Sequence, residues 1–322
     1  MTSGIRPTTS PADLDGLDLV AEYGTGLQTT RVHRAQDGGF LWWHRPGAQR
    51  TGPLTAPAAH LVPYLPAETG AALLAVPERV GDGLLHRAAG AASAAAWLRD
   101  FRPSARGLVS HSLASAARAL RVLHRVPVPD DVPLGTPPGL TRLRDWAYGT
   151  SELKDRTLAV WGEERMARLL GWTTDLGPTS DAAGTGRARS LVHGWASVGA
   201  LIPPLSRGRV ALLTGEDLAA GRPELDLGWA LGDLVELAWA ARAVAPPHDC
   251  TDLQRVLLDA YGPGPDPVLV GRSVVLRVVT HMQDFATYRG WDDELLDYIA
   301  LTAELIDEEG RSAVPRGAQG VS

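Results

Sequence analysis

Two residue types on which many enzymes depend are almost missing from this chain of 322 residues. Its 31 basic residues include a single lysine, Lys154, and it contains no asparagine. Chemistry that needs a lysine elsewhere, or an asparagine anywhere, is therefore excluded. Abundant arginine, alanine, glycine and proline with little lysine, asparagine, isoleucine or phenylalanine is typical of a GC-rich genome. The scarcity alone is therefore no evidence that a function has been lost.

Cysteine, positive charge and long apolar runs are also scarce. Cys250 is the only cysteine, which excludes an intramolecular disulfide and a multi-thiolate zinc site and favours a reducing, cytoplasmic location. The net charge of −6 leaves no basic face for a phosphate backbone, so no nucleic-acid partner is expected. No apolar run approaches the roughly 18 residues of a membrane span, and residues 1–18 lack a signal-peptide pattern, so no membrane association or export is expected.

The first part of the chain is predicted to form strands. Residues 1–20 are mostly polar and are expected to form a flexible N-terminal tail. Two strands, at 27–34 and 40–45, flank Asp37-Gly38-Gly39, which is a strong hairpin signal because Asp and Gly tolerate positive φ. A second pair, at 73–76 and 84–87, flanks Gly81-Asp82-Gly83. Residues 21–90 are therefore expected to form a small antiparallel β-rich lobe.

From about residue 91 the apolar residues recur at the three- and four-residue spacing of helices. One helix is expected at 104–124, before Pro127 and Pro129. Further helices are expected at 140–148, 152–171, 225–244, 251–261, 269–286 and 291–308, with a β-hairpin at 191–213 that turns at Ser206-Arg207-Gly208. The whole is an α+β fold with a helical lobe over 91–310 and a disordered tail over 311–322.

This order of segments resembles a two-lobed kinase, and four short strings are similar to the aminoglycoside phosphotransferase (APH)/choline kinase-like family. They are Leu123-His124-Arg125-Val126-Pro127 before the catalytic segment, Leu191-Val192-His193-Gly194 at the start of the catalytic loop, Glu216-Asp217 followed by Asp226-Leu227, and Leu231-Gly232-Asp233-Leu234. The resemblance covers residues 25–310. It implies a protein kinase-like fold with a small antiparallel N-lobe and a large helical C-lobe.

The resemblance also implies which residues should transfer a phosphoryl group, and they are missing. Kinase chemistry uses a lysine for the ATP phosphates, a carboxylate base, and an amide and a carboxylate for Mg²⁺. The family's catalytic loop reads His-Gly-Asp-x-x-x-x-Asn, but this chain has Trp195 at the base and Ala200 at the amide. Thr214 stands at the second metal carboxylate, and Trp43 stands near the lysine position. An indole cannot accept a proton from a hydroxyl, so the usual chemistry is not expected.

Other side chains offer replacements. Glu216, Asp217 and Asp226 are candidate metal ligands, although an acidic turn exposed to solvent, or a cap for the following segment, explains the first two better. Arg45 lies two residues after Trp43, on the same face of a strand, and is a candidate phosphate ligand. His193 is expected to keep a structural role in the loop. Ser110-His111-Ser112 lacks the Gly-x-Ser-x-Gly elbow of hydrolases and is a weak alternative.

The sequence therefore favours a catalytically degenerate member of this fold, a pseudokinase, with no cofactor or metal expected. Members of the family act on ribosomal peptides in actinomycetes, which implies a peptide-binding or scaffold subunit in a ribosomal-peptide (RiPP) pathway of the class V lanthipeptide or thioamitide type. A precursor peptide and a partner lyase are the expected partners, with Trp43 and Trp195 as ligand contacts.

The alternative is an active phosphotransferase with rearranged residues. It would use ATP and Mg²⁺ and phosphorylate a peptide Ser or Thr, or a small-molecule hydroxyl. A plain antibiotic-resistance kinase is disfavoured because the catalytic base is absent.

Overall fold

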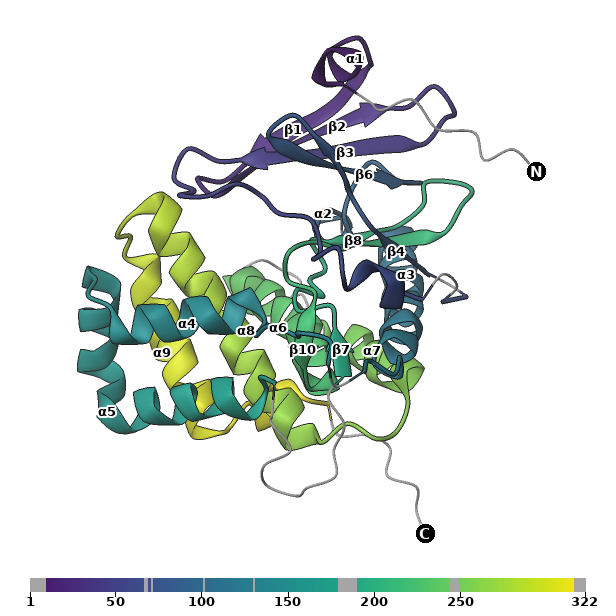
Figure 1. The fold of residues 1–322 in the computed structure, drawn as a ribbon. Coiled ribbons are helices and arrows are strands. Elements are labelled where there is room, and N and C mark those ends of the chain that lie inside the picture. The colour runs from purple at the N-terminus through teal and green to yellow at the C-terminus, as the bar shows by residue number, and fades with distance from the viewer. Residues whose placement is uncertain are drawn as a thin grey trace.

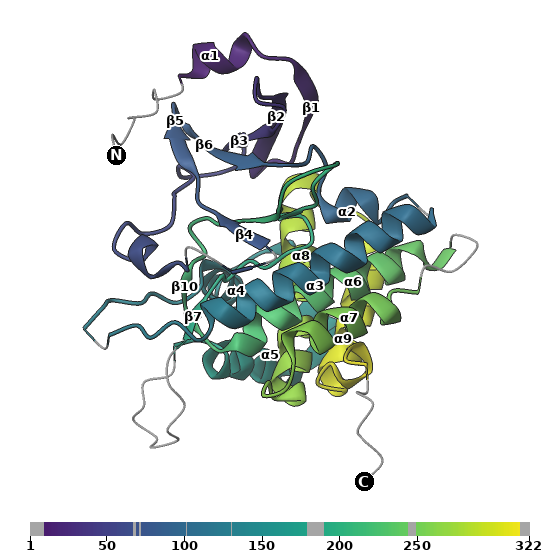
Figure 2. The same cartoon turned by 90° about the vertical axis from the view of Figure 1, so that its right-hand side faces the viewer.

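The computed structural model describes residues 10–66, 69–70, 72–100, 102–129, 131–178, 190–243 and 249–315. Figure 1 shows a β-rich N-terminal lobe above a larger helical lobe, which confirms the α+β two-lobed architecture expected from the sequence. Figure 2, turned by 90°, shows the same division. None of the helices in these ranges is long and apolar enough to cross a membrane.

A five-stranded antiparallel sheet forms the N-lobe, in the order β1-β2-β3-β6-β5. Its strands are β1 (Leu19–Gly24), β2 (Gln28–Arg34), β3 (Phe40–Pro46), β5 (Glu78–Val80) and β6 (Gly83–Ala88). The predicted hairpin around Gly38 is confirmed, because β2 pairs with β3 and Gly38 has a φ of 82°. The second predicted hairpin is displaced: its turn at Gly81 joins β5 to β6.

The displaced strand, β4 (Ala72–Ala75), belongs to a different sheet. It pairs in parallel with β9 (Val210–Leu213), which also pairs with β8 (Leu201–Ile202). Pro77 lacks the N–H needed to continue the ladder, and the side chains of Ala72 and Leu74 are buried in the core of the helical lobe. Both figures show β4 between the N-lobe sheet and the helices.

The turn of the predicted hairpin over 191–213 lies between β8 and β9, which pair antiparallel, but the predicted first strand is not part of that hairpin. The predicted first strand, β7 (Ser190–Val192), pairs with β10 (Ala219–Gly221), whereas the predicted last strand is β9. All four β9 residues are buried. A strand buried on both faces reads as a continuous apolar run, so its sequence does not indicate which strand lies beside it.

The helices follow the predicted periodicity closely. They are α2 (Ala94–Trp97), α3 (Pro103–Leu123), α4 (Pro138–Tyr148), α5 (Glu152–Asp175), α6 (Pro223–Ala240), α7 (Thr251–Tyr261), α8 (Pro267–Arg289) and α9 (Glu294–Asp307). Helix α6 packs along α8 at the centre of the lobe, and its side chains are buried along most of its length.

Parts of both predicted tails are structured. Helix α1 (Pro11–Asp15) begins at Ser10 with a capping box, and Leu14 is fully buried against the outer face of the N-lobe sheet. At the other end, the 3₁₀ turn η4 (Arg311–Ala313) buries Ala313. The rest of both predicted tails, residues 1–9 and 316–322, lies outside the described residues.

Candidate functional site

The loop after β7 is held in place by Asp226 of α6. Oδ2 of Asp226 accepts the backbone N–H of His193 at 2.7 Å, and Oδ1 accepts that of Gly194 at 2.8 Å. Gly194 has a φ of 77°, and a side chain on it would overlap the backbone carbonyl of Asp217. Position 194 therefore requires glycine.

Asp226 also continues a buried chain of hydrogen bonds into the helical lobe. Its Oδ2 lies 2.8 Å from Nε2 of His124, whose Nδ1 lies 2.9 Å from the Tyr261 hydroxyl. Both carboxylate oxygens of Asp226 therefore take part in positioning the loop, and the role of Asp226 as a metal ligand stays a prediction. Within the described ranges, no group of three or more His, Cys, Asp or Glu side chains is placed to hold a metal ion.

A second carboxylate, Asp233, holds the other end of the loop. Its Oδ2 accepts hydrogen bonds from the Ser197 hydroxyl and the Val198 N–H, both at 2.7 Å. Its Oδ1 forms an ion pair with Nη2 of Arg277 at 2.5 Å. The sequence placed Asp233 only in a helix string; its role shows in the fold because α6 packs beside the loop.

Trp195, at the expected catalytic base, is half-buried among aromatic and cationic groups. Its ring centroid lies 5.8 Å from that of Trp229. The guanidinium carbons of Arg142 and Arg277 lie 5.3 and 5.7 Å from the same ring. Two cations therefore lie within cation–π distance of the Trp195 indole, and the indole itself accepts no proton.

The end of β9, where a metal carboxylate is expected, is used to join the two lobes. The Thr214 hydroxyl donates to the Ala75 carbonyl at 2.7 Å and is buried. The Leu213 carbonyl lies 3.0 Å from Nε2 of His193, and the Thr214 carbonyl lies 2.8 Å from Nε2 of His86 on β6. Thr214 is therefore committed to backbone contacts.

Glu216 ties this strand end to the segment that follows β3. It pairs with Arg50 at 2.6 Å, and its Oε2 accepts the hydroxyl of Thr55 at 2.7 Å. Burial raises the pKa of Glu216, but the hydrogen bonds from Thr55 and Arg50 outweigh burial and hold that pKa below its ordinary value. Glu216 is ionised and paired; Arg50, which sequence reasoning missed, is the basic residue beside this strand end.

Asp217 differs from its neighbour because its Oδ1 is buried without a hydrogen-bond partner among the described residues. Burial raises the pKa of Asp217 to about 7, against the lowering charge of Arg142. Asp284 of α8 also feels the charge of Arg142, and burial raises its pKa too. Two carboxyls with raised pKa values thus lie near the Trp195 loop, and no sequence motif marks Asp284.

Strand β3 presents different side chains from those expected. Trp43 packs on the outer face of the sheet with Leu14 and Leu85, and its Nε1 donates to the Val80 carbonyl at 3.2 Å. Arg45 lies over Trp43 on that face and pairs with Asp82 at 2.9 Å. Trp43 and Arg45, predicted as a ligand contact and a phosphate ligand, therefore lie on the face of the sheet opposite Trp42 and His44.

The alternate side chains of β3, Trp42 and His44, face the other way. Trp42 is buried in the cluster that includes Leu213 of β9, and its Nε1 donates to the Gly90 carbonyl at 2.9 Å. The alternation of a strand shows that adjacent tryptophans face opposite ways but not which one faces the second lobe.

His44 cannot supply the charge of the missing lysine. Its ring lies 5.2 Å from that of His86, and Nδ1 lies 2.9 Å from the Thr30 hydroxyl. Burial and the neighbouring His86 lower the pKa of His44 to about 3, and burial lowers that of His86 to about 4. Both rings are neutral near pH 7. The lone lysine, Lys154, donates to the Gly149 carbonyl at 2.7 Å at the start of α5, away from this junction.

The comparisons with known proteins rest on structure alone. No protein-family model matches the chain, and no curated protein matches it in sequence. Among solved structures, a thermostable mutant of aminoglycoside phosphotransferase APH(4)-Ia, in its apo form, matches 94% of this chain and 96% of its own at 13% identity and a TM-score of 0.51.

Two kinases give similar matches. The Plasmodium vivax ethanolamine kinase covers 94% of this chain and 85% of its own at 10% identity and a TM-score of 0.54. A choline/ethanolamine kinase family protein from Mesorhizobium loti covers 95% and 98% at 16% identity and a TM-score of 0.51. The chain therefore has the two-lobed fold of aminoglycoside phosphotransferases and choline/ethanolamine kinases, as the sequence strings implied.

Proposed function

We propose that this chain is a pseudokinase: a phosphotransferase-fold protein that binds a peptide or a partner enzyme and does not transfer phosphate by the usual kinase route. One observation carries the proposal. Asp226 still holds the backbone of His193 and Gly194 in the catalytic-loop geometry, yet the next residue, Trp195, presents an indole where a base is needed. The scaffold is kept and the reactive side chain is replaced.

The nucleotide side of the site supports the same proposal. Trp42 and the neutral His44 occupy the inward face of β3, and Arg50 is already paired with Glu216. None of these groups offers the free cation that ATP phosphates need. The proposed protein accordingly works without ATP, Mg²⁺ or another cofactor.

The expected ligand is a precursor peptide of a bacterial RiPP pathway, with a lyase as partner enzyme in the cytoplasm. The sequence resemblance supports this part of the proposal. An indole beside two guanidinium groups suits a peptide, because aromatic and arginine side chains give peptide contacts much of their binding energy.

A titration of the purified chain with the precursor peptide encoded beside its gene tests the binding role. Trp195→Ala should lower the affinity for the peptide at least about tenfold, because a central aromatic contact contributes about 2 kcal/mol to binding. Trp291→Ala is the matched control, since Trp291 stacks with Arg156 elsewhere on the helical lobe. Equal peptide affinity of the native chain and Trp195→Ala would contradict the proposal that the peptide binds against Trp195.

A second function is favoured by one specific group. The carboxyl of Asp217 lies beside Gly194, has a free Oδ1, and has a pKa raised to about 7, which suits a general base. Under this alternative the chain phosphorylates a peptide Ser or Thr, or a small-molecule hydroxyl, with Mg²⁺-ATP. Transfer of radiolabelled phosphate that is lost in Asp217→Asn would establish it and overturn the pseudokinase proposal.

A further inference from the structure

Two segments of the N-lobe are joined into one unit, which we call the clamp: residues 24–28, where β1 turns into β2, and residues 47–55, which follow β3. The backbone N–H of Gly47 donates to the Leu27 carbonyl at 3.0 Å, and that of Gln49 donates to the Gly26 carbonyl at 2.7 Å. A side chain on Gly47 would overlap the backbone of Gly26, so the two segments are in direct contact. A movement of one segment therefore displaces the other.

The first contact of the clamp outside the N-lobe sheet is with Glu216, in the turn after β9. Nη2 of Arg50 lies 2.6 Å from Oε1 of Glu216, and Oε2 of Glu216 accepts the Thr55 hydroxyl at 2.7 Å. Arg50 also donates to the carbonyls of Gly52 and Pro53, at 3.0 and 3.2 Å. Both carboxylate oxygens of Glu216 are therefore engaged by the clamp.

The second contact is with Tyr288, near the C-terminal end of α8. A Cβ atom added to Gly26 would lie 3.0 Å from the Cβ atom of Tyr288, so the backbone of the turn lies directly against this helix. Figures 1 and 2 both show the end of α8 close to the N-lobe sheet. The clamp therefore extends from the turn after β9 to the end of α8.

Both contacts belong to elements that also touch the Trp195 loop. The turn after β9 does so through Asp217, whose carbonyl lies against Gly194. Helix α8 does so through Arg277, whose guanidinium carbon lies 5.7 Å from the Trp195 ring. Tyr288 follows Arg277 by about three helical turns, so both side chains project from the same face of α8, about 16 Å apart. The clamp therefore closes on the face of α8 that carries the Trp195 contact.

We propose that the clamp holds the two lobes closed beside Trp195 and must open before a peptide binds there. The clamp's own contacts stabilise the closed form, because the Arg50 guanidinium and both oxygens of Glu216 are already paired. A peptide that requires the open form binds with an affinity that is lowered by the fraction of molecules that are open. This inference rests on the proposed peptide-binding function and adds the step that controls access to its site.

Labelling of a thiol at position 195 tests the clamp without any peptide. The chain carries Trp195→Cys, and Cys250→Ala removes its only native cysteine. A maleimide reagent should label this chain about two- to fivefold faster when Arg50→Ala is added, because a partly exposed ion pair stabilises the closed form by about that factor. Arg31→Ala is the matched control, since it breaks an arginine–glutamate pair with Glu22, 2.9 Å long, within the N-lobe sheet, and it should leave the rate unchanged.

A disulfide across the second contact tests the same step with the peptide. Gly26→Cys with Tyr288→Cys, in the Cys250→Ala chain, brings two Cβ atoms close to the separation of about 3.8 Å that disulfides require. The oxidised chain should bind the precursor peptide encoded beside its gene at least about tenfold more weakly than the reduced chain. Glu22→Cys with Arg31→Cys is the matched control, because these residues lie directly opposite each other in β1 and β2, and its oxidation should not change the affinity.

Glu216→Gln replaces Arg50→Ala if that variant is poorly folded, and it should also speed the labelling. An unchanged labelling rate in the clamp variant, or equal or tighter peptide binding by the oxidised Gly26→Cys/Tyr288→Cys chain, would overturn the clamp. Faster labelling with no peptide binding by any form of the chain would support the clamp and contradict the peptide-binding function instead.

Discussion

At the scale of single residues, the fold restricts position 194 to glycine. Its φ of 77° costs an L-residue about 1–2 kcal/mol, and an added Cβ would overlap the Asp217 carbonyl. Gly194→Ala should therefore lower the free energy of unfolding by about 2 kcal/mol or more in urea denaturation. Gly107→Ala is the matched control, because Gly107 is exposed in α3 and no atom lies near its Cβ position. The free energy of unfolding of this variant should rise by up to about 1 kcal/mol. Equal stability of the two variants would contradict the tight loop.

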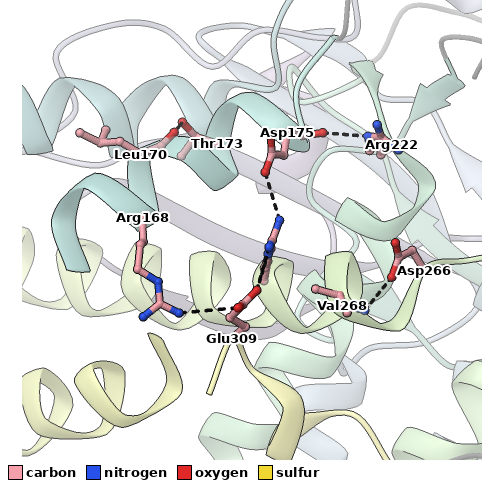
Figure 3. A network of polar contacts seen from close by, with 9 residues as sticks. Arg168, Leu170, Thr173, Asp175, Arg222, Asp266, Val268 and Glu309 are labelled. Carbon is pink, nitrogen blue, oxygen red and sulfur yellow. Dashed lines mark hydrogen bonds and ion pairs between the residues drawn. The ribbon is translucent and has the colours of Figure 1, made fainter. Parts of the chain in front are cut away.

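At the scale of elements, an ion-pair cluster joins the C-terminal turn to α5 and α8. Arg272 pairs with Glu309 at 2.7 Å and with Asp175 at 3.2 Å, and Arg168 lies 3.8 Å from Glu309. Figure 3 shows Arg168 reaching toward Glu309 and Asp175 lying beside Arg222. The Nε of Arg222 donates to the Asp175 carbonyl at 2.8 Å, so the cluster also reaches the start of α6.

This cluster predicts a salt-dependent loss of stability in Arg272→Ala. Because one guanidinium serves two partly exposed carboxylates, the variant should lose about 1 kcal/mol at low ionic strength and less in 1 M salt. The more exposed pair of Arg34 and Asp18, at 3.5 Å, provides the control, and Arg34→Ala should change stability by less than about 0.5 kcal/mol. A loss that is unchanged in high salt would assign the effect to packing of Arg272 on Trp172.

A second element-scale contact joins the lobes through Glu216. Arg50→Ala should release the segment after β3, because Glu216 would keep only Thr55 as a partner. Amide hydrogen exchange in residues 47–56 should speed up at least about fivefold, with little change in α6. Arg45→Ala, on the outer face of β3, is the control that should leave this exchange unchanged. Unchanged exchange in Arg50→Ala would show that the ion pair does not hold the segment.

The elements also show what sequence reasoning can reach. The helices from α3 to α9 were predictable because apolar periodicity is local, and the hairpin of β2 and β3 because its turn residues are local. The pairing of β4 with β9 was not predictable, because it joins segments more than 100 residues apart. The same reason hid the contact of Arg142 with Trp195, since Arg142 belongs to no motif.

At the scale of the whole molecule, neutral histidines join the lobes and make stability depend on pH. The pKa of His44 is lowered to about 3, below its value of about 6.5 in the unfolded chain. The unfolded chain therefore binds more protons between these pH values, and stability is lost as the pH falls below about 6.5. His86 acts in the same direction. Asp217 acts in the opposite direction, because its pKa of about 7 lies above its unfolded value.

Two variants separate these effects in urea denaturation at pH 7 and pH 4.5. His44→Phe should lose about 2 kcal/mol less than the native chain on acidification, because the group that resists protonation is gone. Asp217→Asn should lose more than the native chain, because a group that gains a proton in the folded state is gone. The same acid-induced loss in all three proteins would contradict the neutral buried state of His44.

We propose that this chain has a phosphotransferase fold but does not bind nucleotide in the usual kinase manner. Calorimetric titration of the native chain with Mg²⁺-ATP tests this account most directly. The account predicts no binding heat up to about 1 mM nucleotide, because the inward face of β3 carries Trp42 and the neutral His44, and the nearby Arg50 is paired with Glu216. Saturable Mg²⁺-dependent binding of ATP that is lost in Asp217→Asn would contradict it.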